Sequence, residues 1–61
     1  MNIHTARLLG QVETAIFAGE MDAEQAVQYM IYNSEIDADD LDQVRAKIQQ
    51  TVADANREPK Q

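Results

Sequence analysis

Cysteine and tryptophan are absent from this 61-residue chain, and serine and histidine occur only once each, as Ser34 and His4. Without cysteine the protein can form neither a disulfide framework nor a thiolate metal site. One serine, one histidine near the chain end and a few threonines do not form a recognisable catalytic triad. We therefore expect a protein that is not an enzyme and that carries no cofactor.

Long hydrophobic runs are also missing, since no uninterrupted apolar stretch exceeds four residues. A membrane-spanning helix needs about 20 apolar residues, and the core of a signal peptide needs about 7 to 15. The sequence thus predicts a protein without a membrane segment, located in the cytoplasm.

The chain is short enough to allow only one domain, which we place at residues 1–58, followed by a polar tail at residues 59–61. A domain of this size buries only about 60% of the surface of its extended chain, so its stability is marginal. Because its large apolar side chains are few, the core should be thin. A thin core favours self-association, and we expect a homodimer.

Helical periodicity is the main pattern that the sequence does contain. Apolar residues recur three and four positions apart in three stretches, which predicts helices at about residues 3–18, 23–33 and 38–57. Gly19 is suited to end the first helix, and Asp22 with Gln25 has the pattern of a capping box at the start of the second. The expected fold class is all-α, either a compact bundle or an intertwined helical dimer.

The same spacing predicts which residues face the core. The first helix should bury a row that includes Ile3, Leu9, Val12 and Ile16, and the second a row formed by Ala23, Ala26, Val27, Met30 and Ile31. Gly10 lies inside the first helix, where glycine costs up to about 1 kcal/mol relative to alanine. It therefore indicates either a close helix crossing or a tolerated fault.

A dense acidic run precedes and begins the third helix. It consists of Glu35, Asp37, Asp39, Asp40 and Asp42, with no base between them. Asp37 is placed to cap the helix, with Ile36 and Leu41 as a hydrophobic staple around it. The following acids fall in the first turns, where the helix dipole favours negative charge by about 0.3 to 1 kcal/mol each. Helix initiation therefore explains much of this run.

A calcium loop is an alternative reason for these acids. An EF-hand loop requires oxygen ligands at its first, third and fifth positions, a glycine at the sixth and a glutamate at the twelfth. A loop that begins at Asp37 has Ile48 at the twelfth position, and one that begins at Asn33 has Val44 there. Neither frame supplies the glutamate, so we expect no metal site.

Residues 38–44, A-D-D-L-D-Q-V, resemble the A-D-S-L-D-x-V segment at which acyl carrier proteins carry phosphopantetheine. Asp40 stands where that family has its serine, so the hydroxyl that would be esterified is absent and carrier function is not expected. By analogy, the resemblance implies that an acidic helix start can serve as a docking face for basic partners.

Charge is unevenly distributed along the chain, whose net charge is −6. Residues 20–42 contain eight acids and no lysine or arginine, which predicts an acidic pole. Nucleic-acid affinity depends on neutralising phosphates with lysine and arginine, so direct nucleic-acid binding is not expected. An acidic pole can instead attract another protein with a basic surface.

Four consecutive large residues, Tyr29, Met30, Ile31 and Tyr32, cannot all face one core from a helix. Met30 and Ile31 fit the predicted buried row. Tyr29 and Tyr32 are then left either to cover the small core or to contact a second copy of the chain or a foreign partner. Tyrosine suits an interface because it combines an apolar ring with a polar hydroxyl.

These patterns predict a small acidic, non-catalytic binding protein that modulates or inhibits a partner protein. The expected partner-binding residues are Tyr29, Tyr32, Glu35, Asp37, Asp39, Asp40 and Asp42. Inhibitors of host machinery encoded by phages or mobile elements commonly have such a composition. Two alternatives stay open, which are a structural subunit of a larger assembly and a nucleic-acid mimic that occupies the basic groove of a nucleic-acid-binding protein.

Overall fold

The computed structural model describes residues 1–57 and contains three helices, α1 (Ile3–Phe17), α2 (Ala23–Asn33) and α3 (Ala38–Arg57). The helix boundaries agree with those expected from the sequence to within one residue, and the all-α fold class is confirmed. The predicted polar tail at residues 59–61 lies outside the described residues. None of the helices in the described part combines the length and hydropathy needed to cross a bilayer.

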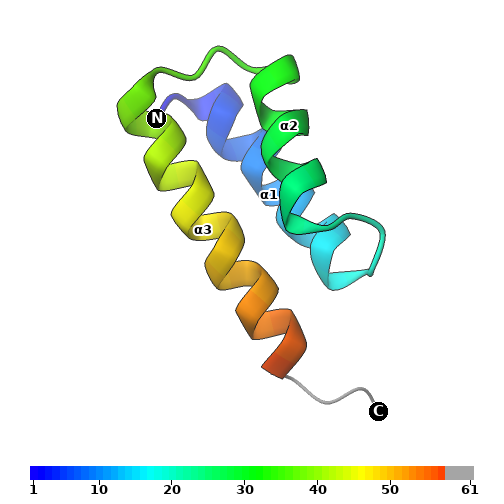
Figure 1. Ribbon diagram of the computed structural model, residues 1–61. Helices are drawn as coiled ribbons and strands as arrows, with labels where there is room; N and C mark the ends of the chain where they lie inside the picture. Colours follow the sequence, from blue (N-terminus) through cyan, green and yellow to red (C-terminus); the bar gives the residue numbers. More distant parts are fainter. Residues whose placement is uncertain (58–61) are drawn as a thin grey trace.

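The helices pack as a compact three-helix bundle within a single chain. Each helix contacts both of the others. In Figure 1, α1 and α3 run in roughly the same direction and α2 returns antiparallel to them, with the chain start beside the beginning of α3. Of the two expected architectures, the compact bundle is therefore the one observed, since the core closes without an exchange of helices.

The core lies where the apolar faces of the three helices meet. Its buried apolar side chains are Leu8, Leu9, Val12, Ile16, Ala26, Met30, Val44 and Ile48. Met30 and Ala26 are both 0% exposed and are the buried residues of α2. At about 1.5 to 3 kcal/mol for burying one large apolar side chain, this cluster is the main source of stability.

Side-chain caps start each helix. The Asn2 side chain accepts a hydrogen bond from the backbone N–H of Thr5 at 2.7 Å. The predicted capping box at Asp22 is confirmed, because Asp22 accepts from the Gln25 N–H at 2.8 Å and the Gln25 side chain accepts from the Asp22 N–H at 3.1 Å. Asp37 caps α3 as expected and accepts from the N–H of Asp40 at 2.9 Å.

Gly19 ends α1 in the way that its position predicts. Its φ of 77° is in the left-handed region that favours glycine. The N–H of Gly19 donates to the carbonyl of Ile16 at 3.0 Å, and the N–H of Glu20 donates to that of Ala15 at 2.9 Å. This pair of bonds is a Schellman motif, which satisfies carbonyls that the helix end would otherwise leave unpaired.

Two residues expected in the core are exposed instead. Ile3 has 75% and Ile31 has 45% of its surface exposed. Ile3 is the first residue of α1, and Ile31 lies at the edge of the α2 face that the other helices cover. The suggestion of a close crossing at Gly10 is also wrong, because a Cβ at this position would meet nothing within 4 Å.

Three side-chain or terminal contacts between distant residues gather at one end of the bundle, where α1 begins, α2 ends and α3 begins. The Thr5 and Ser34 hydroxyl oxygens are 2.6 Å apart. His4 Nε2 is 3.2 Å from the carbonyl oxygen of Asn33, and the amino group of Met1 is 3.3 Å from the carboxylate of Asp40. We call this region the polar end.

Candidate functional site

The five acids of residues 35–42, which we call the acidic segment, lie at the polar end and divide into two groups. Asp37 and Asp40 have structural partners, since Asp37 caps α3 and Asp40 pairs with the amino group of Met1. The side chain of Asp40 is only 23% exposed. These two carboxylates are therefore at least partly engaged in holding the polar end together.

Glu35, Asp39 and Asp42 form the other group. All three are exposed, and within residues 1–57 none of them forms an ion pair. Asp39 lies in the first turn of α3, where it favours the helix N-terminus. Glu35 and Asp42 lie outside that turn, so helix initiation does not account for their charge. These acids are available to an external cation.

Metal binding is not supported by any grouping in the described part of the chain. Across residues 1–57, no three side chains of histidine, aspartate or glutamate are arranged so that they could hold a metal ion together. The acids of the acidic segment instead spread along the connection and around the start of α3.

Tyr29 and Tyr32 are both exposed, at 40% and 81% of their surfaces. Of the alternatives left open by the sequence, covering the core is therefore not the role of Tyr32. Tyr32 and Glu35 line the same shallow depression at the polar end. Tyr29 instead lines a neighbouring depression with Met21 and Tyr32. The structure thus brings Tyr32 next to the acidic segment, whereas Tyr29 lies on the side away from it.

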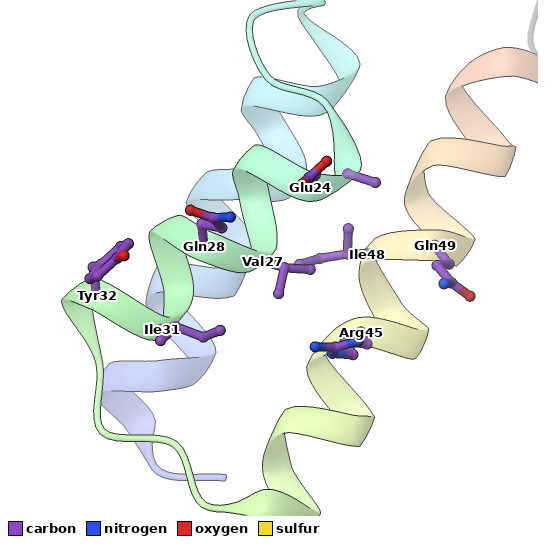
Figure 2. A pocket seen from close by; sticks show the side chains of 9 residues that line it. Glu24, Val27, Gln28, Ile31, Tyr32, Arg45, Ile48 and Gln49 are labelled. Carbon is purple, nitrogen blue, oxygen red and sulfur yellow. The ribbon is translucent and has the colours of Figure 1, made fainter.

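A groove of about 600 Å³ runs between α2 and α3. We call it the α2–α3 groove. Its lining residues are Ala23, Glu24, Val27, Gln28, Ile31, Tyr32, Arg45, Ile48 and Gln49. Figure 2 shows Val27 and Ile48 meeting between the two helices, with Arg45 extending from α3 toward α2.

Sequence reasoning missed Ile31 and Arg45 as surface features of this groove. Ile31 fits the expected buried row, and no pattern described above singles out Arg45. The run of four large residues at positions 29–32 did contain the signal, because a short helix can bury only part of such a run. Which of the four residues would be exposed could not be predicted, because this depends on which side of α2 is covered by α1 and α3 in the packed bundle.

The buried polar side chains have hydrogen-bond partners inside the bundle. Within residues 1–57 the buried polar side chains are Thr5 and Thr51. Thr51 donates its hydroxyl to the carbonyl of Lys47 at 2.9 Å, and Thr5 is paired with Ser34. Every ionisable side chain of the described part therefore has contact with solvent.

Comparison with known proteins yields no family model, no curated protein and no solved structure that matches this chain.

Proposed function

We propose that this protein is a small non-catalytic binding protein that modulates a partner protein through Tyr32 and the acidic segment. The observation that carries the proposal is the position of Tyr32, which is 81% exposed and lines one depression together with Glu35. An aromatic ring left in water beside a carboxylate contributes nothing evident to the fold. It does match the composition of interface centres, where tyrosine is enriched.

The charge of the surface indicates the kind of partner. Glu35, Asp39 and Asp42 are exposed and lack ion-pair partners within residues 1–57. A basic protein surface would neutralise them, and complementary charge would speed the encounter and exclude acidic competitors. Tyr29 is assigned a secondary place, because it lies on the far side of Tyr32 from these acids.

The test is capture of the partner from a nuclease-treated lysate of the native host with the tagged protein, followed by mass spectrometry. The expected result is one stoichiometric protein that Tyr32→Ala and Asp42→Lys each release. Glu13→Lys is the matched control, because it changes the charge equally on α1 and should leave capture intact. Capture that survives both Tyr32→Ala and Asp42→Lys would remove the proposed surface from consideration.

Two narrower functions depend on the identity of the captured protein. A nucleic-acid-binding partner from which duplex DNA displaces this chain would make it a nucleic-acid mimic, whereas a component of host machinery would agree with a phage or mobile-element inhibitor. The other alternative, a structural subunit, is favoured by the exposure of Ile31 and of both tyrosines on α2. Its signature is self-association without any other stoichiometric partner.

A further inference from the structure

The α2–α3 groove has an apolar floor and polar walls. Val27 and Ile48 lie at its centre, and Ile31 adds a side chain that is 45% exposed. Glu24, Gln28 and Gln49 supply most of the polar lining. A concave strip of this kind between two helices fits the apolar face of a third helix, which buries anchors three and four positions apart.

Ile31 connects this groove to the acidic segment. The same side chain lines the α2–α3 groove and an adjoining depression formed with Glu35, Asp37 and Asp40. A helix laid against Val27 and Ile31 would therefore continue over carboxylates at the polar end. The part of the helix that lies over these carboxylates must be positively charged, because a negatively charged segment would be repelled by them.

We propose that the α2–α3 groove binds an amphipathic, lysine- or arginine-rich helix of the partner protein, which packs as a fourth helix on this bundle. The inference rests on the proposed function and specifies its partner as a basic helix. Apolar side chains of that helix contact Val27 and Ile31, and its cations lie over Glu35 and the neighbouring acids.

A second copy of this chain fits the groove less well because of its charge. Residues 20–42 include all of α2 and contain eight acids without a lysine or arginine. Glu24 is the single acid on α2 itself, and the other seven lie in the segments before and after it. Packing two copies of α2 together, parallel or antiparallel, would therefore bring the acids at the ends of one copy near those of the other. Arg45 is the single basic residue that lines the groove, and it cannot neutralise them all. A basic helix removes this repulsion.

Arg45 also gives the site a specificity element. It is exposed, and it forms no ion pair within residues 1–57. Arg45 would repel a helix whose polar residues are all cationic, but it would not repel one that has an acid or an amide at the position facing it. The native partner is therefore expected to interrupt its basic face once, opposite Arg45.

The test uses three fluorescent synthetic peptides of about 14 residues, which is about four helical turns. The first is an amphipathic helix of leucine and lysine. The second has the same composition scrambled so that no apolar face forms, and the third has glutamate in place of lysine. Fluorescence anisotropy with the full chain should show binding of the first peptide only, and the affinity should fall as salt screens the charges.

Variants then locate the binding. Ile31→Ser should weaken binding of the leucine–lysine helix by about tenfold, as expected for an interface anchor. Ile3→Ser is the matched control, because Ile3 is also exposed but lies outside the groove, and it should have less than about a twofold effect. Arg45→Glu should strengthen binding by about threefold or more, because it replaces repulsion by attraction.

Several outcomes overturn the inference. Equal binding of the scrambled peptide would mean that charge alone drives the interaction, and equal effects of Ile31→Ser and Ile3→Ser would place the contact elsewhere. A concentration-dependent dimer that Ile31→Ser dissolves would assign the groove to a second copy. If Tyr32→Ala abolishes partner capture but Ile31→Ser does not, the proposed function stands and only the groove assignment fails.

Discussion

The side-chain hydroxyls of Thr5 and Ser34 lie 2.6 Å apart and join the start of α1 to the end of α2. Thr5 is only 1% exposed, so its hydroxyl has little access to water. This hydrogen bond therefore connects residues that are 29 positions apart and satisfies a buried polar group at the same time.

Removal of Ser34's hydroxyl tests this connection. Ser34→Ala leaves the Thr5 hydroxyl without its partner and should lower the free energy of unfolding by about 1 to 2 kcal/mol. In a Thr5→Val background, which deletes the buried hydroxyl but keeps the shape, the same change should cost less than about 0.5 kcal/mol. Urea denaturation of the four proteins of this cycle provides the measurement, and additive effects would argue against the bond.

Capping and charge can be separated at Asp37. Because its carboxylate accepts from the N–H of Asp40, Asp37→Ala should destabilise the protein by about 1 kcal/mol. Asparagine caps about as well as aspartate, so Asp37→Asn should change the free energy of unfolding by no more than about a few tenths of a kcal/mol. Thermal unfolding followed by circular dichroism gives both values, and equal losses would show that the negative charge matters more than the cap.

The two glycines should respond in opposite directions to alanine. Gly10 lies inside α1, and a Cβ there meets nothing within 4 Å, so Gly10→Ala should stabilise the protein by about 0.5 to 1 kcal/mol. Gly19 has the same free space but a φ of 77°, so Gly19→Ala should destabilise it by about 1 kcal/mol. Melting temperatures that shift in the same direction would contradict this distinction.

Of two nearby residues on α2, we expect Met30 to determine stability and Tyr32 to determine partner binding. Met30 is 0% exposed, and Met30→Ala should cost about 2 to 5 kcal/mol, which is most of the stability of so small a domain. Tyr32 is 81% exposed, and Tyr32→Ala should change stability by less than about 0.5 kcal/mol. Denaturation curves for both variants, measured beside partner capture, test this. An unfolded Tyr32→Ala protein would assign the ring a structural role.

Local signals explain why the helices could be located from the sequence alone. Asp22, Asp37 and Gly19 each act within one turn of their own position, through bonds to neighbouring backbone groups. Such bonds depend on a few adjacent residues, so their pattern can be read without knowing the fold. The core positions Val12, Ile16 and Met30 were likewise evident from helical spacing.

Features that depend on how the helices pack could not be read in this way. Ile31 fits the buried row by spacing, yet it faces a groove that α3 leaves open. Thr5 is polar and was not expected inside, although Ser34 arrives from a distant part of the chain to pair with it. The ion pairing of the acids also depends on the packing, because Asp40 pairs with the amino group of Met1, which is distant in the sequence.

The polar end has a further consequence for motion. Its contacts at Thr5, His4 and Asp40 are the hydrogen bonds and ion pair that join distant parts of the chain within residues 1–57. The hydrogen bonds at the Gly19 end join close neighbours. Amide hydrogen exchange should therefore be slower at the polar end, and local opening should begin at the opposite end. A partner would then meet a backbone that is already ordered around the acidic segment, so little backbone conformational entropy is lost on association.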